Sequence, residues 1–234
     1  MMIRNAPRPL QDEPTYRAAE AAHILALPTG TVKAWCFGQD YEPRAGGRKR
    51  FVALIEPAQG KFLSFTNLCE LQVLAAIRRR HRVPMPAVRK ALAYVQQKLG
   101  VDRPFASNGL LTNGVDLFVE QAGQLLNVSA AGQQAMREDF ERALKRIEYG
   151  DNGSPVLLFP FTRTQPTSAD EPRTVLVDPR RSFGRPVVAG AYVRTQVIEE
   201  RFRAGDRIAD MAQDYEVSAA DIEEALRFES RQAA

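Results

Sequence analysis

The chain has 234 residues, of which 44% are hydrophobic and 26% charged, enough apolar material for one large core or two smaller ones. No run approaches the roughly 18 apolar residues of a membrane span, and the N-terminus has no apolar stretch of the secretory type, so the composition predicts a soluble cytoplasmic protein. With two cysteines and two histidines, a disulfide framework or ordinary metal site is not expected, and we predict reduced thiols, no metal and no cofactor.

The positive charge is concentrated in the first part of the chain. Residues 1–104 contain 17 Lys and Arg against 8 Asp and Glu, whereas residues 105–172 contain 5 against 9 and residues 173–234 contain 10 against 11. A basic half joined to a nearly neutral remainder is typical of a nucleic-acid-binding domain attached to a unit with another role. A generally basic protein is the alternative interpretation.

Residues 16–38 predict two short helices joined by a tight turn. Small and apolar residues recur at helical spacing on both sides of the sequence LPTG: Ala18, Ala21, Ala22 and Leu25 before it, Val32 and Trp35 after it. Leu27 would fill the corner, and Thr29, Thr31 and Lys33 would face outward from the second helix. The pattern favours a helix-turn-helix whose second helix reads base edges, although a purely structural helical hairpin has the same pattern.

The next segment predicts a basic β-hairpin. Gly46 and Gly47 separate a charged arm from the β-prone sequence FVALIE, and the cations Arg44, Arg48, Lys49 and Arg50 lie around the tip. A basic hairpin directly after a helix-turn-helix is typical of a wing, whose flexible cations contact phosphates beside the groove. An ordinary solvated turn is the alternative.

Two longer helices follow. Leu68, Leu71, Leu74, Ala75 and Ile77 form an apolar stripe, and Val88, Leu92 and Val95 form another after VPMP. The arginines between residues 78 and 82 end the first helix, where they could either complement the helix dipole or contact DNA.

These elements, in this order, carry a family resemblance. The sequences YRAAEAA, TVKAW, LSFTNLCELQVLAAIRR and VPMPAVRKAL, with the basic wing between them, resemble the winged-helix domain of MerR-type regulators and, more closely, the DNA-binding half of the long VapB-type antitoxins. The resemblance implies a winged helix-turn-helix domain over residues 1–104, with operator DNA as its ligand.

Residues 105–161 have a mixed pattern, which we interpret as a bridging subdomain or dimer surface. LLTNGVDLFVE predicts two short strands about Asn113-Gly114, and PVLLFPF predicts another strand. Between them lies an amphipathic helix with Ala135, Phe140, Leu144 and Ile147 facing inward. Residues 162–172, polar and with two prolines, are the expected linker.

Residues 173–234 predict a small unit of three helices preceded by the motif VLVDPRRSFGRPVVAG. Asp178-Pro179 and Gly184-Arg185-Pro186 favour turns, and VLV and VV favour short strands. Phe183 is either a core residue or an exposed anchor. The segment contains no histidine, and the motif lacks the minimal set for acid–base or metal catalysis, so we expect no enzyme and no catalytic residue.

This segment is similar to a compact bacterial domain that occurs alone as a short antitoxin and also behind a MerR-like half. The resemblance implies a type II antitoxin that represses its own operon and neutralises a PIN-domain ribonuclease. Because operators bound by such proteins are usually two-fold, we also expect a homodimer. Guanidinium groups pair well with the carboxylates of such a nuclease, so the predicted toxin contacts are Arg180, Arg181, Phe183, Arg185, Tyr192 and Arg194. The alternative function is a stand-alone MerR-like transcriptional regulator. The expected fold class is mainly α (α+β), with a winged helix-turn-helix, a mixed subdomain and a C-terminal tri-helical, helix-turn-helix-like domain.

Overall fold

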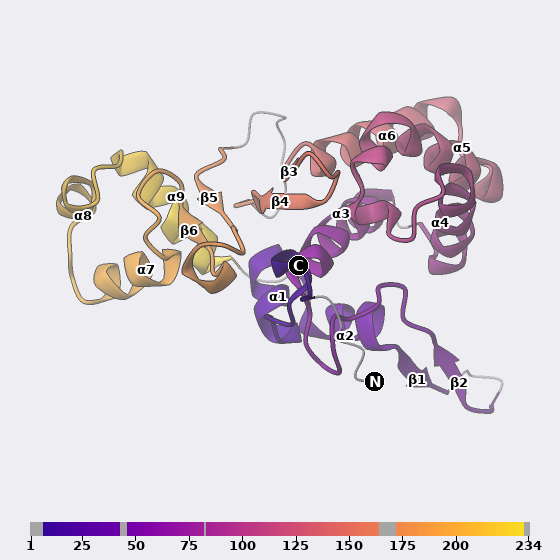
Figure 1. Cartoon of the computed structure of the whole chain (residues 1–234), viewed down its shortest axis with the longest axis horizontal. Coiled ribbons are helices and arrows are strands. Elements are labelled where there is room, and N and C mark those ends of the chain that lie inside the picture. The colour runs from indigo at the N-terminus through magenta and orange to yellow at the C-terminus, as the bar shows by residue number, and fades with distance from the viewer. Residues whose placement is uncertain (1–6, 43–45, 82, 164–171, 232–234) are drawn as a thin grey trace.

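The computed structural model describes residues 7–42, 46–81, 83–163 and 172–231 (Figure 1). The helices are α1 (Ala18–Leu25), α2 (Thr29–Phe37), α3 (Phe65–His81), α4 (Met85–Leu99), α5 (Val115–Leu126), α6 (Ala130–Leu144), α7 (Thr195–Arg203), α8 (Ile208–Asp214) and α9 (Ala219–Ser230). Small antiparallel sheets pair β1 (Gln39–Tyr41) with β2 (Lys49–Phe51), β3 (Ile147–Tyr149) with β4 (Pro155–Leu158), and β5 (Val175–Leu176) with β6 (Val187–Val188). The mainly helical α+β class is therefore confirmed.

The predicted helix-turn-helix is present. Helix α1 ends where Ala26 adopts a left-handed conformation with φ of 48°, and the Leu27 N–H then donates to the Ala22 carbonyl at 2.8 Å. Leu27 is buried in the corner as predicted. Pro28 precedes the first turn of α2, where its fixed φ suits the entry into the helix.

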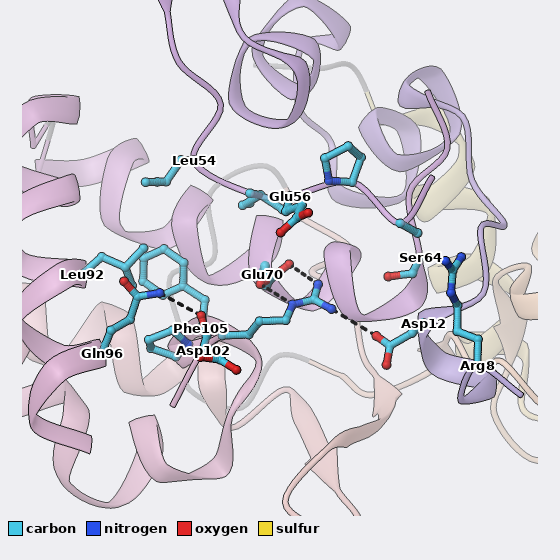
Figure 2. A pocket seen from close by; sticks show the side chains of 15 residues that line it. Arg8, Asp12, Leu54, Glu56, Ser64, Glu70, Leu92, Gln96, Asp102 and Phe105 are labelled. Carbon is cyan, nitrogen blue, oxygen red and sulfur yellow. Dashed lines mark hydrogen bonds and ion pairs between the residues drawn. The ribbon is translucent and has the colours of Figure 1, made fainter. Parts of the chain in front are cut away.

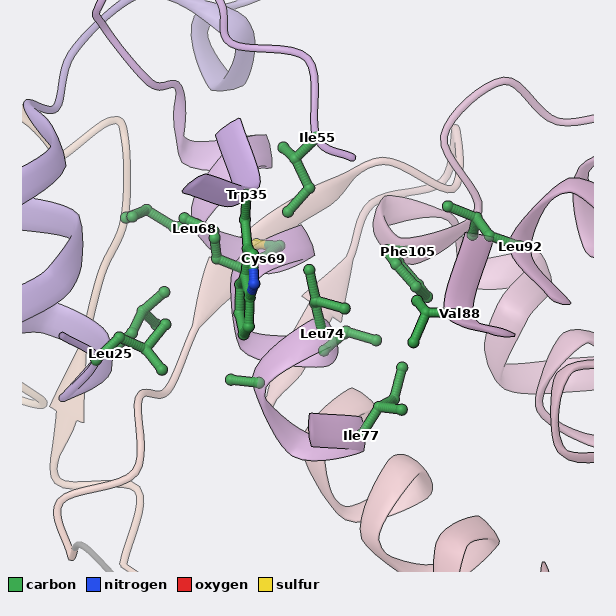
Figure 3. Close-up of a cluster of buried hydrophobic side chains, with 14 of the residues drawn as sticks. Leu25, Trp35, Ile55, Leu68, Cys69, Leu74, Ile77, Val88, Leu92 and Phe105 are labelled. Carbon is green, nitrogen blue, oxygen red and sulfur yellow. The ribbon is translucent and has the colours of Figure 1, made fainter. Parts of the chain in front are cut away.

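Helix α3 lies at the centre of the core. It begins at Phe65 because Ser64 and Asn67 cap it reciprocally: the Ser64 N–H donates to Asn67 Oδ1 at 3.0 Å, and the Asn67 N–H donates to Ser64 Oγ at 3.2 Å. Figure 3 shows Leu74 and Ile77 of α3 between Trp35 on one side and Val88, Leu92 and Phe105 on the other. The two helices predicted after the wing are thus confirmed.

One continuous hydrophobic core extends well beyond the helix-turn-helix. The same cluster of buried side chains includes Tyr16 and Trp35 near the N-terminus and Phe118, Phe140 and Leu158 much later in the chain. Helices α3 and α4 pack directly against α6 and α5. The predicted boundary between residues 104 and 105 therefore does not coincide with a break in this core.

The prediction of two strands about Asn113-Gly114 is wrong. A π-helical turn (Leu110–Gly114) leads directly into α5. Val115, Phe118, Val119 and Ala122 are all buried, and their i, i+3, i+4, i+7 spacing is that of a helix packed on a core. Gly114 is needed for packing rather than for a hairpin, since a Cβ there would lie 2.7 Å from Leu110 Cδ1.

The helix predicted after it is present as α6, with two changes. Phe140 and Leu144 face the core as expected, but Ala135 is exposed and Met136 is buried instead. Ile147 is buried but lies in β3, because α6 has already ended at Leu144. The predicted strand in PVLLFPF is β4.

The C-terminal unit contains the three predicted helices around a smaller core. Ile198, Met211, Ile222 and Ala225 of α7, α8 and α9 pack together with Val188 of β6. Ser218 and Asp221 form the capping box that starts α9. In the part of the chain that the structure describes, no helix has the length and hydropathy needed to cross a bilayer.

Candidate nucleic-acid interface and the C-terminal motif

The first turns of α2 present the side chains predicted to read DNA. Thr29 and Thr31 are half-buried and Lys33 is exposed. The backbone beside Gly30 is open, because a Cβ there would meet no atom within 4 Å. Lys33 has no ion-pair partner among the described residues, so its ammonium is available to a ligand.

The predicted wing is the β1–β2 hairpin. Tyr41 is opposite Lys49 and Asp40 is opposite Arg50 in the antiparallel register. Arg48, whose side chain is 77% exposed, pairs with Asp40 at 3.1 Å, and Arg50 is exposed. Arg44 lies outside the described residues. The described hairpin thus has exposed arginines whose charge is partly compensated by two exposed carboxylates, Asp40 and Glu42.

A groove of about 870 Å³ separates α2, the wing and the start of α4. Gly30 and Thr31 line it from α2, and the guanidiniums that line it belong to Arg50, Arg78 and Arg89. Among the described residues that line the groove there is no carboxylate. Helix α2 and the β1–β2 hairpin therefore border one concave surface of positive charge, which suits a polyanion.

Arg89 of α4 fixes the wing in place, a role that the sequence did not indicate. Its guanidinium donates to the carbonyls of Val52 and of Ala53, the latter at 3.2 Å, and lies 5.2 Å from the centre of the Phe51 ring. Burial lowers the pKa of Arg89 from its usual value. On the other side, the N–H groups of Leu54 and Ile55 donate to the Trp35 carbonyl at 2.8 and 3.1 Å. The wing is therefore held between α2 and α4.

In the C-terminal motif, one buried carboxylate organises two of the predicted toxin contacts. Asp178 is 2% exposed and accepts hydrogen bonds from the N–H and Nε of Arg180 at 2.8 and 3.0 Å. Arg181 Nε lies 3.8 Å from the same carboxylate, and its guanidinium stacks 3.8 Å from the centre of the Tyr192 ring. Arg180, Arg181 and Tyr192 thus form one cluster, whose cations share a single negative charge.

Arg185 points toward the helix-turn-helix. Its Nη1 lies 2.8 Å from Glu20 Oε1, and its guanidinium lies 5.7 Å from the centre of the Tyr16 ring. The Tyr16 hydroxyl donates to the Gly184 carbonyl at 2.8 Å, and burial raises the pKa of Tyr16 well above its usual value. Gly184 has φ of 71°, and a Cβ there would lie 2.2 Å from Tyr16 Oη, so glycine alone fits.

The other two predicted toxin contacts are exposed. Phe183 is 82% exposed, so of the two interpretations of this residue the exposed one is correct. Arg194 precedes α7 and is exposed, and no ion pair joins it to another described residue.

Helix α9 adds further contacts between the C-terminal unit and α1 (Figure 1). Glu229 Oε2 lies 2.8 Å from His23 Nε2, and the Arg231 guanidinium donates to the carbonyls of His23 and Ile24, both at 3.1 Å. Burial acts to raise the pKa of Glu229, but hydrogen bonds from His23 and Thr195 outweigh it, so the pKa lies below its usual value. The C-terminal unit is therefore attached to the helix that supports α2.

A polar cavity of about 360 Å³ lies on another face of α3, and Figure 2 shows its charged residues. Arg103 pairs bidentately with Glu70, at 2.6 and 3.0 Å, and reaches Asp12 at 3.1 Å. These contacts attach the segment before Phe105 to α3. They form a structural ion-pair network that sequence patterns did not indicate, because the three residues are far apart in the chain.

The structure gives no sign of metal or thiol chemistry in its described part. No group of three or more His, Cys, Asp or Glu side chains there could hold a metal ion. Cys36 and Cys69 are free thiols, and both are buried. Burial raises the pKa of Cys36 to about 12, and that of Cys69 is also well above its usual value, which disfavours the nucleophilic thiolate.

Comparisons with known proteins agree with this arrangement. Residues 14–92 match the family profile "Putative DNA-binding HTH domain", and residues 175–228 match "Protein of unknown function (DUF433)". Two Mycobacterium tuberculosis proteins are similar over nearly their whole length: "Putative antitoxin VapB45", 30% identical over 92% of this chain and 93% of the relative, and "Uncharacterized protein Rv2308", 24% identical over 93% and 90%. The crystal structure of Rv2018 from the same organism has the same fold, with a TM-score of 0.65 at 24% identity, covering 92% of this chain and 98% of the other. The chain therefore belongs to the family of long VapB-type antitoxins.

Proposed function

We propose that this chain is the antitoxin of a type II toxin–antitoxin system, which binds operator DNA to repress its own operon and neutralises a PIN-domain ribonuclease. The observation that carries the DNA-binding part is the acid-free groove between α2 and the wing, lined by three arginines. The antitoxin part is supported by the relationship to VapB45 over 92% of the chain.

On DNA, the helix and the wing have different tasks. Thr29, Thr31 and Lys33 lie at the start of α2, the part of a recognition helix that reaches base edges in the major groove. The wing cations, Arg44, Arg48, Lys49 and Arg50, contact phosphates and so add affinity without sequence preference. Operators of such proteins are two-fold, so the functional form is a homodimer.

The toxin-facing residues lie in the C-terminal motif. Arg180, Arg181, Phe183, Arg185, Tyr192 and Arg194 remain the proposed set. Their pairings suggest a division of labour, since Arg185 is occupied by Glu20, whereas Phe183 and Arg194 are exposed. The exposed pair would enter the partner, and the cluster around Asp178 would contact the acidic rim of the nuclease site.

Replacing Arg48, Lys49 and Arg50 together with alanine tests the wing. If each cation neutralises one phosphate, the slope of log K against log salt falls by roughly 2 to 3 units. The measurement is a titration of operator DNA at several salt concentrations. A matched control replaces three exposed cations elsewhere, Lys145, Arg203 and Arg207, and leaves the slope unchanged. A wing variant with the wild-type slope contradicts the assignment.

Thr31→Ala and Lys33→Ala test the recognition helix. Each lost contact costs about 1 to 3 kcal/mol, and only at the base pair that the side chain reads. Binding to a set of operators with single base-pair changes measures this directly. If a variant weakens every operator equally, its side chain has a positioning role instead.

The alternative function is a stand-alone MerR-like transcriptional regulator, with the C-terminal unit as a dimerisation or effector domain. The two functions differ in their gene neighbourhood and in their partner. An antitoxin gene lies beside a short reading frame for a small nuclease with a carboxylate cluster, and the two proteins co-purify. A chain that binds an operator but has no such neighbour and captures no nuclease is a regulator.

A further inference from the structure

We infer that the site for the protein partner is built by both halves of the chain: Tyr16, just before α1, and Glu20 of α1 hold the turn of residues 182–185 in the conformation that presents Phe183. The identity of the partner as a nuclease rests on the proposed function, whereas the conformation of the turn rests on the contacts described below. Tyr16 and Glu20 are positioning residues in this scheme, and Phe183 is the side chain that contacts the partner.

The backbone of this turn is unusual. Ser182, Phe183 and Gly184 have φ values of 47°, 54° and 71°, so three consecutive residues are left-handed. Only glycine adopts that conformation without a steric cost. The Phe183 side chain, which is 82% exposed to solvent, therefore projects from a strained backbone conformation. Such a conformation persists only when surrounding contacts stabilise it.

Contacts from outside the turn hold it. The Tyr16 hydroxyl, 168 residues away in the sequence, donates to the Gly184 carbonyl at 2.8 Å, and Glu20 anchors Arg185 at 2.8 Å. Within the turn, the N–H of Gly184 donates to the Arg181 carbonyl at 2.8 Å and the N–H of Arg185 to the Ser182 carbonyl at 3.0 Å. Strained, over-determined backbone of this kind is typical of binding sites.

The surroundings of Phe183 indicate what it binds. Arg180 and Arg181, which closely precede Phe183 in the chain, share the single carboxylate of Asp178, so this cluster has a net positive charge, and the Arg181 guanidinium stacks on the Tyr192 ring. An exposed aromatic with arginine and tyrosine neighbours has the composition of an interface hot spot. The occupant we assign is a protein surface with an apolar pocket and an acidic rim.

Pre-organisation explains why α1 matters for this site. A turn already held in its bound conformation loses little entropy on association. Because the same contacts join α1 to the C-terminal motif, loosening them leaves Phe183 present but poorly oriented. The site therefore needs the full chain rather than residues 173–234 alone.

The first experiment needs no partner. Hydrogen exchange of the amides of residues 181–185 is compared in full-length wild type, Tyr16→Phe and Tyr149→Phe. Tyr149 is the matched control, because its buried hydroxyl has no hydrogen-bond partner in the described structure. Tyr16→Phe removes one buried hydrogen bond to the turn and should accelerate exchange about fivefold or more, whereas Tyr149→Phe leaves it unchanged. Equal exchange in all three proteins overturns the inference.

The second experiment measures binding of the purified nuclease encoded beside this chain's gene. Phe183→Ala should weaken binding about 30-fold or more, and Tyr16→Phe by a smaller factor of about 3 to 10, the size of one lost hydrogen bond. Phe202→Ala is the control, because Phe202 is 47% exposed on α7 of the same unit and should have no effect.

Each outcome decides one statement. If Phe183→Ala binds the nuclease as wild type does, or weakens operator binding instead, Phe183 is not a protein anchor. If Phe183→Ala weakens binding but Tyr16→Phe does not, the presentation of Phe183 does not depend on Tyr16. If wild type fails to bind the nuclease, the proposed function fails, and hydrogen exchange still decides whether Tyr16 holds the turn.

Discussion

Glu70→Ala should lower the free energy of unfolding by about 3 kcal/mol, because it removes one partner of a largely buried ion pair. Glu70 is 6% exposed; it accepts two hydrogen bonds from Arg103, at 2.6 and 3.0 Å, and one from Asn67 at 2.9 Å. Without the carboxylate, Arg103 keeps its contact with Asp12 at 3.1 Å. Because the Arg103 side chain is 37% exposed and can be partly hydrated, we expect the lower end of the usual range.

Denaturant unfolding followed by circular dichroism measures this loss. The matched control is Asp116→Ala, which removes an Arg–carboxylate pair of similar length, 2.7 Å to Arg137, at a site where the Asp116 side chain is 70% exposed. A surface pair of this kind contributes at most about 1 kcal/mol. A Glu70 variant no less stable than the Asp116 variant would show that the network around Arg103 is not structural.

Phe118→Ala should lower the free energy of unfolding by about 3 to 5 kcal/mol, through lost burial and the cavity left behind. Phe118 is fully buried. Its ring stacks on Phe140 with the centroids 5.3 Å apart and the planes at 15°, and lies 6.1 Å from the ring of Phe105. These rings join α5, α6 and the segment after α4, so their loss weakens the contact of three chain segments at once.

Phe118→Leu and Leu125→Ala are the controls. Leucine fills most of the space, so Phe118→Leu should cost much less than Phe118→Ala. Leu125 lies on the same helix but is 39% exposed, and its replacement should change the stability by about 0.5 kcal/mol or less. If Phe118→Ala and Leu125→Ala are equally stable, residues 115–126 do not pack as the helix α5.

Local sequence patterns were sufficient where neighbouring residues determine the structure. The spacing of Ala18, Ala21 and Leu25 and the corner position of Leu27 each depend on residues less than two helical turns apart, and each was interpreted correctly. The same holds for the wing, whose glycines specify a reversal of the chain.

Patterns were misleading where packing outweighs local preference. Asn113-Gly114 is a strong hairpin signal, yet burying Val115, Phe118 and Val119 against α4 stabilises a helix there. Alternation and helical spacing are hard to separate in a short apolar run. The contact with α4, which makes the helix the better solution, is invisible in a local window.

By itself, the sequence determined the basic N-terminal half, the helix-turn-helix with its wing and the tri-helical end, because periodicity, turn chemistry and charge counts depend on nearby residues. Only the tertiary structure decided which motif residues are free. The Arg185 guanidinium pairs with Glu20, and the Gly184 carbonyl accepts a hydrogen bond from Tyr16, whereas Phe183 is left exposed. Partners more than 160 residues apart are chosen by the packing of whole elements, and no pattern within one segment contains that information.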